Sequence, residues 1–143
     1  YVVGALRTIF VFFKAPMLKI ELDDSVIEQP SLLVSIMNGK RMDGTFMMAP
    51  ESQIDDGKFS LCVARQVSRR GILGLIPRFM KGTQASHPAI QMIESRNVTI
   101  TAPKGNLPAH ADGETLCTQG FHLRIELLPK QIEMIYKPNH KEK

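Results

Sequence analysis

Short runs of alternating apolar and polar residues, separated by turn signals, dominate the sequence after Pro16. Leu18, Ile20 and Leu22 alternate with charged residues, and the same period of two returns in the middle and near the end of the chain. This period is typical of a strand with one buried face. We expect strands at 18–22, 31–37, 59–64, 98–102, 121–127 and 131–136. Many short strands with close turns predict an all-β fold, an antiparallel β-sandwich with one or two short helices.

One segment follows a helical period instead. Its apolar positions recur at helical spacing: Ile72, Leu75, Ile76, Phe79 and Met80. Ser68 can cap the start of this helix and Gly82 lies at its end. Pro77 lies inside it and predicts a kink or two short pieces, because proline has no backbone N–H to donate.

The same segment carries the cations Arg69, Arg70, Arg78 and Lys81 around its apolar positions. Two interpretations stay open, and the first of them is favoured. The helix can pack on the core with a solvated basic side, or it can seat the protein on an anionic membrane surface.

The two ends of the chain differ in character from its middle. Residues 1–13 are almost wholly apolar and begin without methionine. This run is shorter than the roughly 20 residues of a membrane span and lacks signal-peptide features. We interpret 1–16 as the tail of a helix from a linker or preceding domain, 17–137 as the sandwich domain, and 138–143 as a polar tail. The sequence is therefore expected to be a fragment.

Composition limits the classes of function. A chain of 143 residues with 43% hydrophobic content can form one domain with a core. Its net charge of +4 suits an anionic lipid or phosphate but, with no basic-aromatic patch, does not indicate nucleic acid. Cys62 and Cys117 have no metal spacing, so we expect buried, inert thiols and a cytoplasmic location, with attachment to the inner membrane face as an open alternative.

Two acidic turns stand out, at Asp55-Asp56-Gly57 and Asp112-Gly113-Glu114. Asp-Gly is a strong hairpin signal, because glycine tolerates positive φ and aspartate bonds its own backbone. Taken singly, either turn is more simply structural.

The longer motif around the first turn favours a functional interpretation over a purely structural one. It reads Asn38-Gly39-Lys40-Arg41-Met42-Asp43-Gly44, then Met48-Ala49-Pro50, then Ile54-Asp55-Asp56-Gly57-Lys58-Phe59. This order resembles the C-terminal domain of the bacterial diacylglycerol kinase family, which includes sphingosine and ceramide kinases, and the resemblance covers about residues 17–136. It implies the lipid-binding domain of an ATP-dependent lipid kinase acting on the hydroxyl of diacylglycerol or a related lipid.

The resemblance also implies roles for single residues. Glu114 maps onto the proton acceptor of the similar kinases, with Asp112 as its support. The first turn resembles a Mg²⁺ site built largely from backbone carbonyls, which maps onto Gln53, Asp56 and Lys58. His110 could line the catalytic site, although a simple loop histidine is favoured.

ATP is expected to bind mainly to an N-terminal nucleotide-binding domain outside this chain. No Gly-x-x-x-x-Gly-Lys-Ser/Thr loop is present. Asp43-Gly44-Thr45 resembles the end of the family's Gly-Gly-Asp-Gly-Thr motif, but Arg41-Met42 replaces its glycine pair, so we interpret it as a turn. The chain alone is expected to be inactive.

Other interpretations remain at this stage. The chain could be a free-standing lipid- or protein-binding β-sandwich without catalysis, or part of an NAD kinase-like enzyme. Expected partners are the lipid substrate, the protein's own nucleotide-binding domain and a peripheral membrane surface, with an oligomer left open.

Overall fold

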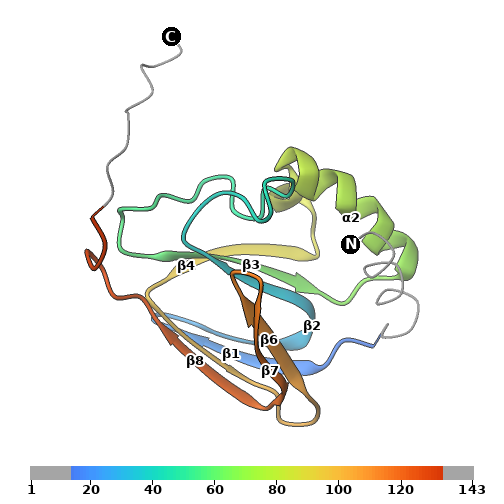
Figure 1. Cartoon of the computed structure of the whole chain (residues 1–143). Coiled ribbons are helices and arrows are strands. Elements are labelled where there is room, and N and C mark those ends of the chain that lie inside the picture. Colours follow the sequence, from blue (N-terminus) through green and yellow to red (C-terminus); the bar gives the residue numbers. More distant parts are fainter. Residues whose placement is uncertain (1–13, 134–143) are drawn as a thin grey trace.

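The computed structural model describes residues 14–133, which form eight strands, one α-helix and one 3₁₀ helix (Figure 1). In chain order these are β1 (Met17–Leu22), β2 (Val26–Met37), β3 (Phe59–Arg65), α2 (Arg69–Lys81), η1 (Gln84–Ser86), β4 (Ile90–Ser95), β5 (Asn97–Thr101), β6 (Leu107–Ala111), β7 (Glu114–Gly120) and β8 (His122–Glu126). All strand pairs are antiparallel. The expected all-β class is confirmed.

A bend in β2 turns one continuous sheet into two facing layers. The sheet has six strands in the order β4-β3-β2-β1-β5-β8. The first half of β2 pairs with β1 up to Pro30, and its second half pairs with β3 from Ser31, with a register shift between Ser31 and Leu33. Figure 1 shows β3 and β4 above β1 and β8, with β2 joining the two levels.

The space between the layers holds the main core. Its buried members come from both layers and from β6: Leu18, Ile20, Leu61, Val63, Val98, Ile100, Ala102 and Leu107. The alternation noted in the sequence places these residues on the inner face of each strand. Because both halves of the sheet bury residues in one cluster, the fold is a sandwich.

The helix α2 covers the outer face of the upper layer. Leu75 and Phe79 pack with Cys62 and Ala64 of β3 and with Met48 in a second core cluster. Strand β3 is therefore buried on both faces. This explains its nearly continuous apolar sequence.

The ends of α2 follow the sequence signals. Ser68 Oγ accepts a hydrogen bond from Gly71 N at 3.1 Å, and Gly82 ends the helix in the left-handed region at φ 72°. Of the two outcomes expected at Pro77, a kink or two short pieces, the second is not found, because α2 is one continuous element. Pro77 is exposed, so water can reach the Leu73 carbonyl that its missing N–H leaves without a helical partner.

Several strand predictions need correction. Strand β2 begins five residues before the expected Ser31, and β4, β6 and β7 were not among the predicted strands. Residues 131–133 are not in a strand, while the rest of 131–136 lies outside the described residues. The expected terminal segments lie largely outside them as well, and 14–16 is not helical.

The two cysteines differ in environment. Cys62 is fully buried, and burial raises the pKa of its thiol to about 11, in agreement with an inert core thiol. Cys117 is only half-buried, and its Sγ donates to the Leu107 carbonyl at 3.2 Å. Within residues 14–133, no helix is long and apolar enough to cross a bilayer.

Candidate functional site

The second acidic turn forms the tip of a hairpin between β6 and β7. Ala111 pairs with Glu114, so the loop consists of Asp112 and Gly113 alone. Both have positive φ, 48° and 87°, as a type I′ turn requires. Asp112 and Glu114 are exposed, and neither side-chain carboxylate has a hydrogen bond or ion pair within residues 14–133. The tip thus presents two free carboxylates to the solvent.

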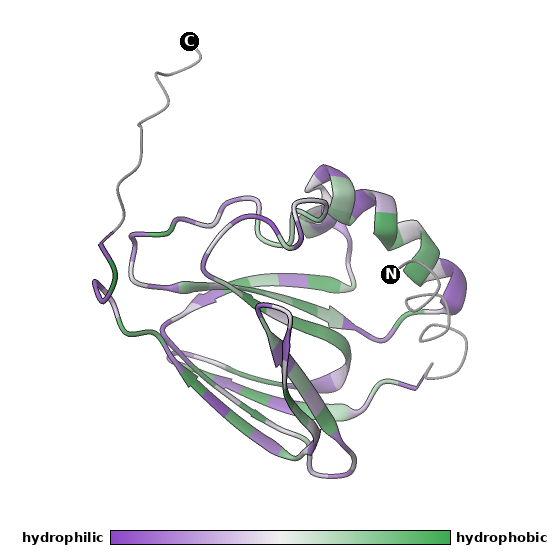
Figure 2. Cartoon of the chain, viewed as in Figure 1, coloured by the Kyte–Doolittle hydropathy of each residue, from purple (hydrophilic) through white to green (hydrophobic). Residues whose placement is uncertain are grey.

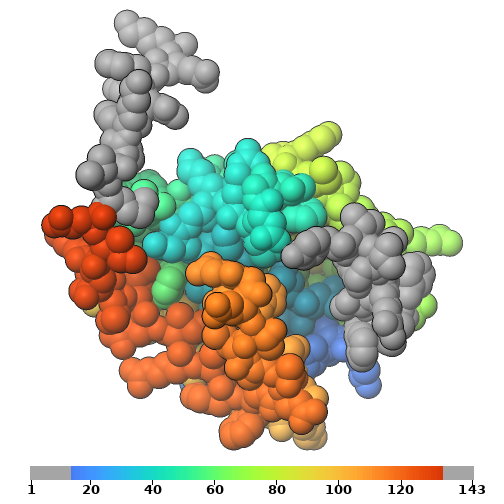
Figure 3. Space-filling model, viewed as in Figure 1, coloured from blue at the N-terminus to red at the C-terminus, as the bar shows by residue number. Residues whose placement is uncertain are grey.

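The hairpin is a separate arm of the sandwich. Its two strands form their own sheet. The strands that precede and follow the hairpin in the chain, β5 and β8, pair with each other. The Ala102 N–H bonds the Phe121 carbonyl at 2.9 Å and closes the base of the arm. Leu107 is buried in the main core and fixes the arm there. Figure 3 shows the arm, in orange, lying on the surface of the visible face.

This geometry suits one chemical task. A carboxylate at the end of a fixed arm can accept a proton from a hydroxyl brought against it by another surface. His110 lies two residues before the turn on β6 and is exposed. His110 pairs with Thr115 of β7 through the backbone, but its imidazole ring has no hydrogen bond within residues 14–133.

The first acidic turn precedes β3 and is held by its own aspartate. Asp56 Oδ1 accepts a hydrogen bond from Lys58 N at 2.9 Å, while Gly57 adopts φ 74°. Lys58 Nζ lies 3.1 Å from Glu94 Oε2 on β4. The hydrogen bond and charge of Glu94 raise the pKa of Lys58 above its ordinary value. The ion pair with Glu94 thus directs the Lys58 ammonium group toward β4.

The donor set of this turn fits Mg²⁺ as an exposed, hydrated site. Gln53, Asp56 and Lys58 are all exposed, and the second carboxylate oxygen of Asp56 has no hydrogen bond in the described part of the chain. Backbone carbonyls and one carboxylate are the hard oxygen ligands that Mg²⁺ prefers, with water completing the shell. Residues 14–133 contain no group of three or more His, Cys, Asp or Glu side chains that could hold a metal ion. A metal here would depend on the carbonyls.

The two acidic turns lie apart. In Figure 1 the hairpin tip lies at the front of the molecule, whereas the turn before β3 lies at the end of the upper layer. The structure does not bring Glu114 together with Asp56. The family resemblance assigned Glu114 to proton transfer and Asp56 to a Mg²⁺ site, and the two turns that carry them occupy separate places in the fold.

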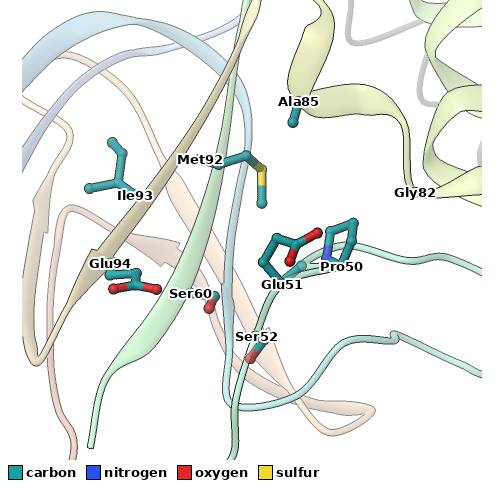
Figure 4. Close-up of a pocket in the computed structure, with 10 residues that line it drawn as sticks. Pro50, Glu51, Ser52, Ser60, Gly82, Ala85, Met92, Ile93 and Glu94 are labelled. Carbon is teal, nitrogen blue, oxygen red and sulfur yellow. The ribbon is translucent and has the colours of Figure 1, made fainter. Parts of the chain in front are cut away.

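A cavity of about 320 Å³ lies beside the first turn (Figure 4). It is lined by Ala49, Pro50, Glu51, Ser52, Ser60, Gly82, Ala85, Met92, Ile93 and Glu94. None of the predicted site residues lines it, although Glu94 joins it to the turn through Lys58. The lining is largely apolar, so the cavity offers space rather than catalytic groups.

The Met48-Ala49-Pro50 segment proves to be a packing element. Met48 and Ala49 are buried, and Gln84 Nε2 donates to the carbonyls of Met47 and Met48 at 2.7 and 3.2 Å. This clamp ties the segment to η1. Sequence reasoning missed Gln84 and Glu94, because their partners lie 36 residues away or more, with no local signal.

Asp23 is another residue whose importance the sequence did not reveal. Its carboxylate accepts hydrogen bonds from Ser95 Oγ, from the backbone N–H groups of Arg96 and Asn97, and from Asn97 Nδ2. These bonds, that from the Arg96 N–H foremost, lower the pKa of Asp23 to about 2. They tie the β1–β2 turn to the β4–β5 corner. The sequence showed only a turn at Asp23.

Comparisons with known proteins agree with this architecture. Residues 1–136 match the model of the YegS C-terminal NAD kinase beta sandwich-like domain. The chain is 33% identical over 108 residues to a protein named "Probable lipid kinase YegS-like" from Shewanella frigidimarina, covering 73% of this chain and 33% of that protein. It is 23% identical over 101 residues to a diacylglycerol kinase from Staphylococcus saprophyticus, covering 71% of this chain and 33% of that protein.

Solved structures show the same fold. A diacylglycerol kinase from Bacillus anthracis str. Sterne superimposes with a TM-score of 0.71 at 23% identity, covering 94% of this chain and 47% of that one. The chain thus spans about a third of the curated relatives it matches and under half of this structure. It belongs to the family of YegS C-terminal, NAD kinase beta sandwich-like domains.

Proposed function

We propose that this chain is the lipid-binding C-terminal domain of an ATP-dependent lipid kinase that phosphorylates the hydroxyl of diacylglycerol or a related lipid. Relatives of the chain are named as lipid or diacylglycerol kinases. One structural observation supports the proposal at the level of individual residues. The hairpin holds two exposed carboxylates, unpaired within residues 14–133, at its two-residue tip.

Glu114 is the proton acceptor in this proposal. The lipid hydroxyl gives its proton to the Glu114 carboxylate as its oxygen bonds to the γ-phosphorus of ATP, and the bond from that phosphorus to the ADP oxygen breaks. Asp112 lies two residues before Glu114 and supports it as the second carboxylate of the hairpin tip. Catalysis of this type depends chiefly on positioning and charge stabilisation. A fixed arm suits that demand.

The turn before β3 serves a separate role. Gln53, Asp56 and Lys58 would hold Mg²⁺ through backbone carbonyls and the Asp56 carboxylate. There the ion would supply positive charge that helps hold the domains and the active site together. The proposed partner is the protein's own nucleotide-binding domain, which would bind most of the ATP. We place the enzyme in the cytoplasm, with peripheral contact to the membrane that contains its substrate.

The proposal is tested by phosphate transfer in the longer protein, that is, this chain joined to the proposed nucleotide-binding domain. Incubated with γ-labelled ATP, it should label diacylglycerol or a related lipid and not NAD, while the 143-residue chain labels neither. Calorimetry of the chain with millimolar ATP should show no saturable binding. Labelling of NAD alone would favour an NAD kinase-like enzyme. No transfer to lipid or NAD would favour a free-standing binding module.

A further inference from the structure

The exposed side of α2 carries an apolar stripe beside a cationic one. Leu73, Pro77 and Met80 occupy positions i, i+4 and i+7 and are all exposed, with Leu73 at 46% and Met80 at 51%. Residues with this spacing lie on one side of a helix. The buried residues of α2, Leu75 and Phe79, face the core from a different side. The stripe is therefore not needed to hold the helix on the sandwich.

The excess of basic over acidic residues in the protein arises in this segment. Residues 66–89 contain Arg69, Arg70, Arg78 and Lys81 and no Asp or Glu. Since the chain has 18 basic and 14 acidic residues, the remainder holds 14 of each. The formal net charge of +4 thus equals the charge of this one segment.

Within residues 14–133, no acidic side chain pairs with Arg70, Arg78 or Lys81. All three residues are exposed. Arg78 Nη1 donates to Ser86 Oγ at 3.3 Å, a neutral partner. Figure 2 shows hydrophobic and hydrophilic residues side by side along α2.

We propose that this surface of α2, namely Leu73, Pro77 and Met80 with Arg70, Arg78 and Lys81, docks the protein onto an anionic lipid bilayer. An interfacial helix needs an apolar side that enters the headgroup region and basic residues that meet anionic lipids. Both are present, and charge complementarity favours an anionic bilayer over a neutral one. The inference rests on the proposed function only in that a lipid kinase must meet a membrane. Docking itself needs no catalysis.

Vesicle binding by the 143-residue chain tests this surface without any activity measurement. The chain should bind vesicles of phosphatidylglycerol and phosphatidylcholine, bind pure phosphatidylcholine far more weakly, and lose affinity as NaCl rises. Replacing Arg70, Arg78 and Lys81 with Gln should weaken binding on the order of a hundredfold, at about fivefold per cation near an anionic surface. A matched variant with Gln at Lys104, Arg124 and Lys130 has the same net charge and should lose much less.

The apolar stripe is tested separately by fluorescence. The chain contains no tryptophan, so a single introduced Trp reports one position. Leu73→Trp emission should shift to the blue on anionic vesicles. Ile54→Trp should not shift, because Ile54 is 64% exposed but precedes Asp55 and Asp56, which an anionic surface repels. Circular dichroism would show that each variant is folded.

Three results would overturn the proposal. The first is equal loss of binding in the two charge variants. The second is a blue shift at position 54 rather than at 73. The third is absence of vesicle binding, combined with a dimer that Leu73→Ser dissociates, since this would assign the stripe to a second copy of the chain. A shift at 73 with selective loss in the Arg70, Arg78 and Lys81 variant supports docking on the bilayer.

Discussion

Replacing Glu114 with Gln in the longer protein should stop catalysis without disturbing the fold. Glutamine keeps the length and most of the shape of glutamate but cannot accept the proton of the lipid hydroxyl. Glu114 is exposed, and its carboxylate has no hydrogen bond or ion pair within residues 14–133. A surface change of this kind alters the free energy of unfolding by about 0.5 kcal/mol at most. A loss of activity would therefore not reflect unfolding.

General acid–base catalysis contributes about 10²–10⁴-fold, so kcat should fall by that factor. At about 1.4 kcal/mol per factor of ten, the activation barrier rises by about 3–6 kcal/mol. This cost is several times larger than the expected change in stability. The KM for lipid should change little, because the lost interaction belongs to the transition state.

Initial rates of lipid phosphorylation at saturating ATP would measure both constants, with thermal unfolding of each variant alongside. Asp112→Asn should cost less, since asparagine also tolerates the positive φ of that position. Glu126→Gln changes another exposed carboxylate, on β8, and should leave kcat unchanged. If Glu114→Gln kept near wild-type kcat in a folded protein, the hairpin tip would be only a structural turn.

Three further changes test other parts of the molecule. Asp56→Ala in the longer protein should weaken Mg²⁺-dependent activity and lower thermal stability in Mg²⁺; unchanged values in both assays would remove the metal assignment. The pKa of Asp23 falls from the ordinary 3.8 to about 2 on folding, so its stabilising effect is present above about pH 4 and is lost as the pH falls through 2. Asp23→Asn should therefore flatten the pH dependence of urea unfolding between pH 2 and 4, and an unchanged slope would contradict the hydrogen-bond network. Leu75→Ala should lower the free energy of unfolding by about 2–5 kcal/mol, because Leu75 of α2 is buried against β3, whereas Leu73→Ala on the exposed side of the helix should cost far less; equal losses in chemical denaturation would show that the helix packs differently.

Local signals were enough to predict many of the elements. The alternation at 18–22 and 98–102, the Ser68 and Gly82 helix ends and the Asp112-Gly113 turn all have their cause within a few residues of sequence. Strand β4 was missed because Gln91, Ile93 and Glu94 give no clean alternation and the strand is specified by its pairing with β3. The strands of the arm were missed for a similar reason, since β7 is mostly exposed on both faces.

The sequence by itself determined that the chain is a β-sandwich with one capped helix and two acidic turns, because period, capping and turn chemistry act between near neighbours. Only the tertiary structure decided that β2 changes its partner from β1 to β3 between Pro30 and Ser31 and so serves both layers, and that Asp23 bonds groups more than 70 residues away. It also placed the Asp112-Gly113 turn at the tip of a separate hairpin, and the turn before β3 at the end of the upper layer. These features depend on which distant strands pair, and pairing depends on burying both layers in one core rather than on any short stretch of sequence.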